Sequence, residues 1–435
     1  MKFLKSTIIY SAYFTAAITL PSISSLIPSI NLDTVYANEV KTKKVPSLRN
    51  KVYSQLARAQ KLADDGKVDE GIAALDDIQR KKASMNDYEV AMMYNFYGFI
   101  HYNQNDLSKA MTAFELVVAQ EAIPESLKLS TLFSLAQLAM ADGKYKKVTN
   151  YLARWDKVNS KPKSDAYYVL KSQALYQDKQ YQASLDSISQ AISLAEGKQQ
   201  IPKENWLVLQ RALFYSLNKP QQVADVLEKM VKLFNKPEYW LQLGNMYGEL
   251  GEETKQLAIL EAAKQQGFIT KKPDVRNLAQ VYLFNGLAFK AAETMKSGLD
   301  TGLIENTNKN LAFVAESFMQ AKEDKKAITF FDKASKLTKT GEYDQRLAEL
   351  YLNNEMFEEA ADSAREALDK GLKNGDSNTY IALGMAQYNL ENFDASILAF
   401  EQAEKHKKAK KLASQWLKFV KREQMNAKAM KTAYL

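Results

Sequence analysis

Apolar residues recur every three or four positions along most of the chain, and short polar turns interrupt this pattern at regular intervals. Such a spacing places the apolar residues on one face of an α-helix. The turns carry residues that end helices, as in Asp142-Gly143 and Asn285-Gly286. Prolines precede several of the new helices, at Pro124, Pro162, Pro202, Pro237 and Pro273. The pattern therefore predicts an all-α chain of short paired helices.

One segment indicates which kind of helical pair this is. Trp240, Leu243, Gly244 and Tyr247 form the pattern W-x-x-L-G-x-x-Y, which is typical of the first helix of the tetratricopeptide repeat. A small residue lets the two helices of a hairpin approach closely, and large neighbours fill the space beside it. The chain thus resembles the tetratricopeptide-repeat superfamily. The second-helix pattern, A-x-x-x-F, occurs at Ala110/Phe114 and Ala327/Phe331, with a near match at Ser396/Phe400.

A small residue recurs at one position of the first helix, and its intervals give the length of the repeat. The intervals run from 33 to 39 residues, close to the 34 of the tetratricopeptide class. Arg211 interrupts the pattern in the fifth unit. We call this place the small position, and its ten residues are Ala59, Gly98, Ala136, Ser172, Arg211, Gly244, Ala279, Ala315, Ala348 and Gly384.

These intervals predict an all-α fold, a right-handed α-solenoid of about ten tetratricopeptide-like hairpins over residues 49–405. One hairpin cannot bury both of its faces, so it must stack on the next. A C-terminal capping helix with a basic tail is expected in 406–435. A membrane-surface helix is the alternative there, although such a helix carries a larger apolar face. The apolar stripe of this last helix consists of Leu412, Ala413, Trp416, Leu417 and Val420.

The N-terminus has the order of a secretory signal peptide. Lys2 and Lys5 give a positive start, residues 8–20 are apolar, and small residues Val35 and Ala37 precede a cleavage point at Ala37/Asn38. We predict a signal peptide in residues 1–37 and a linker in 38–48, with the mature chain exported. The distance from the apolar stretch to the cleavage point is long, so an uncleaved anchor in the inner membrane is the alternative.

Composition narrows the chemistry further. The chain has no cysteine, and its two histidines, His101 and His406, lie far apart in the sequence. Thiol chemistry is therefore excluded, and a histidine-based metal site is not expected. We find no phosphate-binding glycine loop and no nucleophile motif, and we expect neither enzyme activity nor a cofactor. The net charge of +8 favours acidic proteins, anionic lipid surfaces or acidic polymers as partners. Nucleic acid is not expected for an exported chain, and membrane association is expected to be peripheral at most.

First helices line the concave face of a stacked array, so their residues not used in hairpin packing are the candidate partner-binding residues. The N-terminal half is rich in aromatic side chains at these places, and such side chains anchor peptides and helices. The same rings are equally compatible with packing between neighbouring units. The candidates are Phe99, Tyr102, Phe133, Gln137, Met140, Gln173, Tyr176, Tyr215, Asn245 and Gln280.

Some tetratricopeptide proteins hold a C-terminal carboxylate with lysine, asparagine and arginine side chains from three repeats. Asn245, Asn277 and Lys309 fall at matching positions, but Leu241 and Phe313 replace the first lysine and the final arginine. Because the forked arginine side chain is the donor that a carboxylate favours, we do not expect this mode of binding.

A closer resemblance extends over the C-terminal half. The segment YWLQLGNMYGELG, residues 239–251, is followed by the turn Gln265-Gln266-Gly267-Phe268, and Gln415-Trp416 stands near the end. These segments resemble the periplasmic tetratricopeptide proteins encoded beside TonB–ExbB–ExbD energy-transduction systems of Gram-negative bacteria. The resemblance implies a periplasmic protein-binding scaffold for TonB-dependent transport, with periplasmic segments of TonB or ExbD as partners and no catalytic residues. A scaffold for polysaccharide export or outer-membrane assembly is the alternative function.

Overall fold

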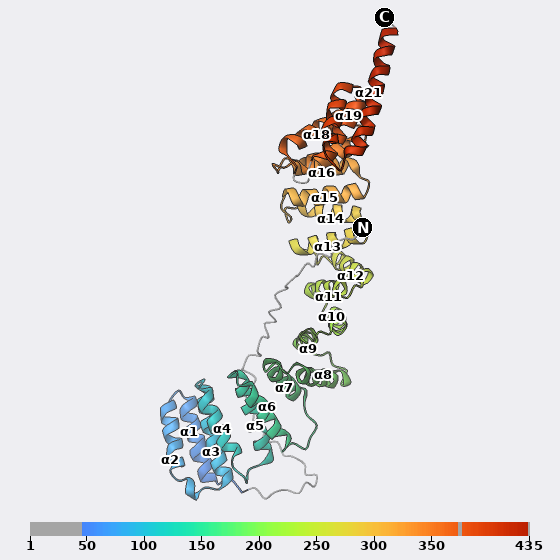
Figure 1. Cartoon of the computed structure of the whole chain (residues 1–435). Coiled ribbons are helices and arrows are strands. Elements are labelled where there is room, and N and C mark those ends of the chain that lie inside the picture. Colours follow the sequence, from blue (N-terminus) through green and yellow to red (C-terminus); the bar gives the residue numbers. More distant parts are fainter. Residues whose placement is uncertain (1–45, 373–375, 434–435) are drawn as a thin grey trace. The chain divides into compact units, whose positions relative to one another are not determined.

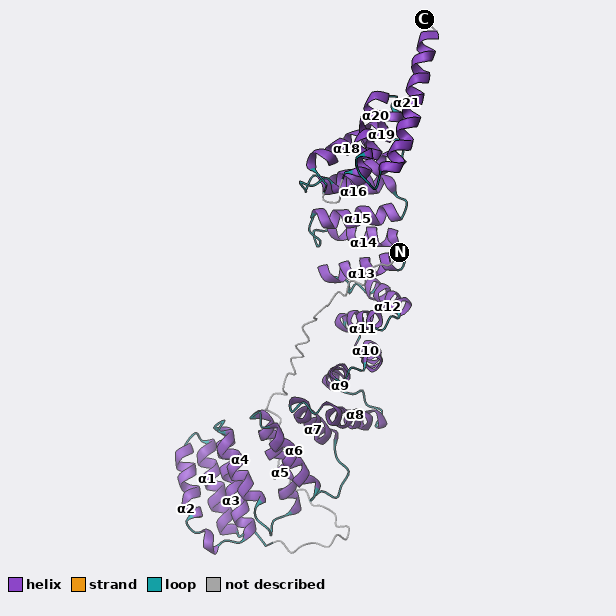
Figure 2. Ribbon diagram, viewed as in Figure 1, coloured by secondary structure: helices purple, strands orange, loops and turns teal. Residues whose placement is uncertain are grey.

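The computed structural model describes residues 46–372 and 376–433, and in these ranges every regular element is a helix (Figure 2). The chain divides into two compact units, the first ending at Phe234 and the second beginning at Asn235. The predicted all-helical solenoid of about ten hairpins is confirmed. The predicted signal peptide, residues 1–37, and most of the predicted linker lie outside the described residues.

Unit 1 contains five helical hairpins, and each hairpin contacts the next one along the chain (Figure 1). A short 3₁₀ helix, Lys82–Ser84, follows the first hairpin. The hairpins are α1 (Asn50–Asp64) with α2 (Val68–Gln79), α3 (Asp87–Asn103) with α4 (Leu107–Val118), α5 (Glu125–Ala141) with α6 (Tyr145–Asp156), α7 (Asp165–Gln177) with α8 (Tyr181–Gly197), and α9 (Glu204–Ser216) with α10 (Pro220–Phe234).

Unit 2 repeats the same plan with five further hairpins and one additional helix (Figure 1). The hairpins are α11 (Pro237–Glu249) with α12 (Glu253–Gln265), α13 (Lys272–Phe284) with α14 (Ala288–Asp300), α15 (Asn308–Gln320) with α16 (Asp324–Ser335), α17 (Glu342–Asn353) with α18 (Phe357–Lys370), and α19 (Ser377–Asn389) with α20 (Phe393–Glu404). The additional helix is α21 (Lys410–Ala433).

The small position lies inside every hairpin. All ten of its residues are buried, including Arg211, so the fifth hairpin forms around a long charged side chain. A Cβ added to Gly98 would lie 2.5 Å from the ring of Phe114, and one added to Gly244 would lie 2.6 Å from Leu260. Both partners stand on the second helix, sixteen residues after the small position. The buried residues at this distance are Leu75, Phe114, Leu152, Ile188, Leu227, Leu260, Met295, Phe331, Ala364 and Phe400.

Every hairpin turn closes in the same way. The residue seven positions after the small position has a left-handed backbone, with φ between +53° and +85°. In the sixth hairpin, the Gly251 N–H donates to the Gly248 carbonyl at 3.2 Å, and the Glu252 N–H donates to the Tyr247 carbonyl at 2.8 Å. The same two bonds occur in all ten turns, which is the Schellman motif. The left-handed residues are Gly66, Asn105, Gly143, Lys179, Asn218, Gly251, Gly286, Lys322, Glu355 and Glu391.

The last helix, α21, covers the end of unit 2. Ala413, Leu417 and Val420 are buried against the final hairpin, and the Trp416 ring stacks on Phe400 with centroids 5.5 Å apart. The predicted apolar stripe therefore packs as a cap, except for Leu412, which is exposed. Among the described helices, none has both the length and the apolar character that crossing a bilayer requires.

The turns that carry lysine or glutamate at the left-handed position predict a gain in stability. A side chain in this conformation costs about 1–2 kcal/mol, whereas glycine adopts it freely but loses more entropy on folding. We expect Lys179→Gly and Glu391→Gly each to raise the free energy of unfolding by about 0.5–1 kcal/mol, measured from urea midpoints. The control is Lys333→Gly inside α16, which should lose about 1 kcal/mol. Lower midpoints for the two turn variants would contradict the prediction.

Candidate binding face

Two rows of side chains run across the first helices of unit 1. The first row follows directly after the small position, with Phe99 on α3, Gln137 on α5 and Gln173 on α7. The second row lies three residues further along the same helices. Because residues three apart share one helix face, the rows are adjacent. We call this surface the unit 1 face, and its second row consists of Tyr102, Met140, Tyr176 and, on α9, Tyr215.

The aromatic side chains of the unit 1 face are divided between packing and exposure. The Phe99 ring meets Phe114 of its own hairpin edge-on, with centroids 5.4 Å apart, and the Tyr176 ring lies 5.8 Å from Tyr181 of α8. Both residues remain half-buried, as do Tyr102 and Phe133, which pack against the core of unit 1. These rings therefore pack against the rest of unit 1 on one side and remain partly exposed to solvent.

Two members of the second row differ in exposure. Met140 is 8% exposed and belongs to the hydrophobic core, so it offers little surface to a partner. Tyr215 is 53% exposed and is the most accessible ring among the candidates. The Tyr215 side chain is therefore accessible to a partner. The Met140 side chain is not, because it packs in the core between hairpins.

Gln137 and Gln173 are half-buried, and within the described residues neither amide makes a side-chain hydrogen bond. A primary amide offers both a donor and an acceptor, so it can pair with the N–H and C=O groups of a peptide backbone. The axes of two packed helices lie about 10 Å apart. An extended chain covers that distance in about three residues. Gln137 and Gln173 occupy the same place on successive first helices, so a peptide that crosses these helices can meet both amides.

Unit 2 carries candidates of the same kind. Asn245 on α11 is exposed, and its carbonyl oxygen accepts a hydrogen bond from the Asn277 amide on α13 at 2.8 Å. Gln280 on α13 is also exposed, and it forms no side-chain hydrogen bond among the described residues. Both candidates follow directly after the small position, like Gln137 and Gln173. This bond occupies the Asn245 oxygen, so the Asn245 side chain is less available to a ligand than its position alone predicts.

A hollow lined by residues of α2, α3 and α4 was not predicted. It has a volume of about 210 Å³ and is lined by aromatic, cationic and aliphatic side chains, among them Tyr94, His101, Lys109 and Leu116. Burial and the charge of Lys109 lower the pKa of His101. The neutral imidazole and the tyrosine ring give the hollow a mainly apolar wall, which suits an aliphatic or aromatic side chain.

Two exposed phenylalanines in unit 2 were also missed. Phe284 ends α13 and is 71% exposed, and Phe289 on α14 is 44% exposed, with the Lys326 ammonium 4.8 Å from its ring centroid. A comparison of repeat positions reveals them in the sequence. Phe284 stands five residues after the small position and Phe289 ten residues after it, and the other nine hairpins carry polar residues or alanine at these two places.

The nearest approach to a catalytic arrangement is a buried cluster in unit 2. The Lys370 ammonium donates to the Ser335 hydroxyl at 2.9 Å and to the Asp344 carboxylate at 3.0 Å, and the Ser335 hydroxyl donates to Asp344. Burial lowers the pKa of Lys370, but hydrogen bonds and charges from Asp344 and Glu366 outweigh it and raise the pKa. The amine therefore stays protonated and cannot act as a base. The cluster joins α16, α17 and α18.

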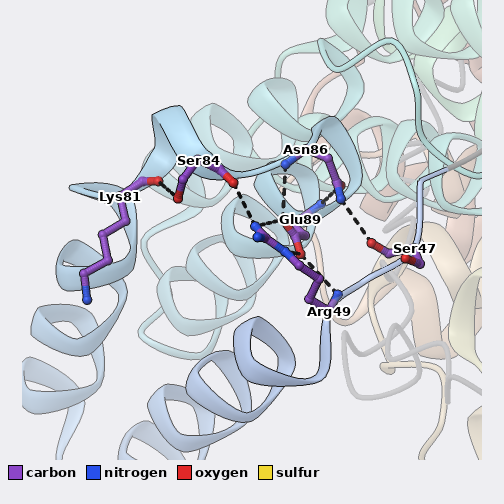
Figure 3. A network of polar contacts seen from close by, with 6 residues as sticks. All are labelled: Ser47, Arg49, Lys81, Ser84, Asn86 and Glu89. Atoms are coloured by element: carbon purple, nitrogen blue, oxygen red, sulfur yellow. Dashed lines mark hydrogen bonds and ion pairs between the residues drawn. The ribbon is translucent and has the colours of Figure 1, made fainter.

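A second buried carboxylate closes the N-terminal end of unit 1 (Figure 3). Glu89 is fully buried, and the Arg49 guanidinium forms two bonds of 2.6 Å to its oxygens. The backbone N–H groups of Arg49 and Asn86 also donate to Glu89, each at 3.1 Å. Arg49 further donates to the Ser84 carbonyl at 2.8 Å. The network fastens the chain just before α1 to the start of α3.

These bonds make the stability of unit 1 depend on pH. The hydrogen bond from Arg49 is the main cause that lowers the pKa of Glu89 in the folded chain. The unfolded chain regains a pKa of about 4.3. The stabilisation is therefore complete above that pH and is lost as the pH falls through the lower, folded pKa. Glu89→Gln should cost about 1–3 kcal/mol at neutral pH and less in acid, measured by hydrogen exchange in α1 and α3.

The matched control for this prediction is Glu70→Gln. Glu70 is an exposed carboxylate on α2, and its oxygen lies 3.6 Å from the Lys67 ammonium. Exposed pairs contribute at most about 1 kcal/mol, so this variant should behave like the unsubstituted chain at both pH values. An equal loss in both variants would contradict the role given to Glu89.

In the described residues, no three acidic or histidine side chains gather closely enough to hold a metal ion. Among sequence-family models, the tetratricopeptide repeat matches residues 377–409, which are the tenth hairpin, α19 and α20. The match supports membership of the tetratricopeptide-repeat superfamily, as the sequence pattern predicted. No curated protein matches the chain.

Solved structures of helical repeat proteins resemble parts of the chain. YrrB, described as a TPR protein with an unusual peptide-binding site, is 15% identical, with 44% of this chain and 97% of YrrB covered and a TM-score of 0.36. A tetratricopeptide repeat protein from Parabacteroides merdae is 13% identical, with 66% of this chain and 94% of that protein covered and a TM-score of 0.34. The TPR domain of P58(IPK) is 14% identical, with 87% and 99% covered and a TM-score of 0.24.

Proposed function

We propose that this protein is a scaffold that binds another protein through the unit 1 face. The observation that carries the proposal is the pair of unbonded amides, Gln137 and Gln173, beside a row of partly exposed tyrosines. These half-buried amides make no side-chain hydrogen bond within the described residues, so a ligand can pair with them in place of water. Stacked helical hairpins offer extended surfaces that such proteins use for binding. An extended peptide segment satisfies both the amides and the rings.

The partner that we propose is a periplasmic segment of TonB-type transport machinery. The support is the resemblance of residues 239–251 and the later segments to tetratricopeptide proteins encoded beside such systems. The net charge of +8 adds a long-range attraction if the bound segment is acidic. The alternative is a scaffold for polysaccharide export or outer-membrane assembly, which would use the same face for a different protein.

The proposal requires that the chain leaves the cytoplasm. We propose that residues 1–37 are removed and that the mature chain, beginning at Asn38, works in the periplasm. In a Gram-negative host, osmotic shock should release a protein whose N-terminal sequence starts at or near Asn38. Recovery in the membrane fraction with Met1 retained would instead support the inner-membrane anchor. Recovery in the cytoplasm would contradict export altogether.

Calorimetry of the purified protein against periplasmic segments of TonB and ExbD tests the partner. Each buried anchor of an interface is worth about 2 kcal/mol, and about 1.4 kcal/mol corresponds to a tenfold change in affinity. Replacing Tyr102 and Tyr176 together by alanine should therefore weaken binding by at least about 30-fold. Gln137→Ala with Gln173→Ala should weaken it by about tenfold, because two peptide hydrogen bonds are lost.

The control is Tyr53→Ala, which removes an exposed tyrosine of α1 outside the two rows. This variant should bind like the unsubstituted protein. If neither TonB nor ExbD segments bind at high micromolar concentration, the transport assignment fails and the other envelope scaffolds take its place. If binding survives the double tyrosine substitution in a folded variant, the partner stands and the unit 1 face is wrong.

A further inference from the structure

The positive charge of the chain is concentrated at its C-terminus. Residues 405–435, which we call the basic end, contain ten lysine and arginine residues and one acidic residue, Glu423, whereas the whole chain carries a net charge of +8. The basic end alone therefore has a net charge of +9, and the preceding 404 residues have a net charge of −1. The excess positive charge is therefore confined to the basic end and is not spread over the whole chain, so the basic end needs its own explanation.

Few of these charges are neutralised within the structure. Lys421 pairs with Glu401 at 3.2 Å, and Arg422 pairs with Glu423 at 3.4 Å. Five other lysines of the basic end are exposed and form no ion pair with any described residue. In the body of unit 2, by contrast, Lys290 pairs with Glu261 of the preceding hairpin, and Lys272 pairs with Glu305 in the connection before α15. The five are Lys407, Lys408, Lys410, Lys411 and Lys418.

The uncharged residues of the basic end limit what it can bind. Trp416 and Phe419 pack on Phe400 and Tyr388, so these rings are not free to stack on nucleic-acid bases. The Arg422 guanidinium lies over the Phe419 ring at 5.5 Å. Beside the lysines and a few exposed polar side chains such as Gln415 and Asn426, the large apolar side chains that remain exposed are Leu412, Met425 and Met430, which are 47%, 69% and 65% exposed.

The geometry points to an anionic phospholipid surface as the ligand of the basic end, and we propose that α21 docks there. Lysines near such a surface are attracted to the headgroups, while aliphatic side chains enter the boundary between headgroups and acyl chains. Helix α21 continues beyond α19 and α20 (Figure 2), so its last turns can lie along a membrane. The contact is peripheral, and it is made by residues of unit 2.

Flotation with lipid vesicles tests the proposal on the full chain. One vesicle type contains phosphatidylcholine alone and the other contains equal parts of phosphatidylcholine and phosphatidylglycerol. The readout is the difference in binding between the two, so any binding by the apolar residues 8–20, common to all variants, cancels. Each lysine near an anionic surface strengthens binding about fivefold. The variant with Lys407, Lys408, Lys410, Lys411 and Lys418 replaced by glutamine should therefore lose at least about 100-fold.

A matched control removes the same number of charges elsewhere. Lys271, Lys309, Lys322, Lys325 and Lys339 are exposed in unit 2, and their replacement by glutamine should lower binding by less than about fivefold. An equal loss in both variants would show that overall charge drives the binding, which overturns the proposal. Equal binding of the unsubstituted chain to both vesicle types would also overturn the proposal. An acidic protein segment would then be the ligand that best fits the basic end.

Two aliphatic substitutions separate a membrane from other polyanions. Leu412→Gln with Met425→Gln should weaken binding to anionic vesicles by about tenfold, because their apolar surface no longer leaves water. The same substitutions should leave the binding of a DNA duplex unchanged, since that binding depends on charge alone. The membrane proposal is wrong if these substitutions leave vesicle binding unchanged and the duplex binds as tightly as the vesicles. The basic end would then bind polyanions in general.

Discussion

In each of the ten turns, an N–H group donates back over five residues to a carbonyl of the first helix, and the residue before it takes a left-handed backbone. This motif sets where the second helix starts relative to the first. In the three hairpins with glycine at the small position, the residue sixteen positions later meets it: Phe114 meets Gly98, Leu260 meets Gly244 and Phe400 meets Gly384. The hairpin core, and the direction of the first-helix residues that form the unit 1 face, therefore depend on one backbone conformation repeated ten times.

The sequence predicts this framework well because it depends on periodic positions. All ten residues of the small position are buried, and the capping helix packs through the predicted stripe apart from Leu412. Arg211 interrupts the sequence pattern although it is buried like the other nine residues, because a pattern of residue types does not show whether a hairpin can enclose a long side chain. The turns at Lys179, Lys322, Glu355 and Glu391 are invisible to a search for glycine, since the neighbouring hydrogen bonds impose the left-handed conformation there.

The candidate face is predicted less completely, for a different reason. Register assigns Met140 and Tyr215 to the same row, yet the first is buried and the second is exposed. The difference depends on what the next hairpin places against each residue, and helical period carries no information about neighbours. The exposed Phe284 and Phe289 are the opposite case. They become visible in the sequence once the ten hairpins are aligned on the small position, because polar residues or alanine occupy those places elsewhere.

The fixed distances inside each hairpin contrast with the variable intervals between hairpins, which run from 33 to 39 residues. All of that variation falls after the second helix has met the small position, in the ends of helices and in the connections between hairpins. A chain of this kind can therefore lengthen during evolution only at those junctions, since one residue added within a turn would rotate the following helix by about 100° and face its core residues to water. Insertions, fusions and new domains are accordingly compatible with the connections and incompatible with the turns.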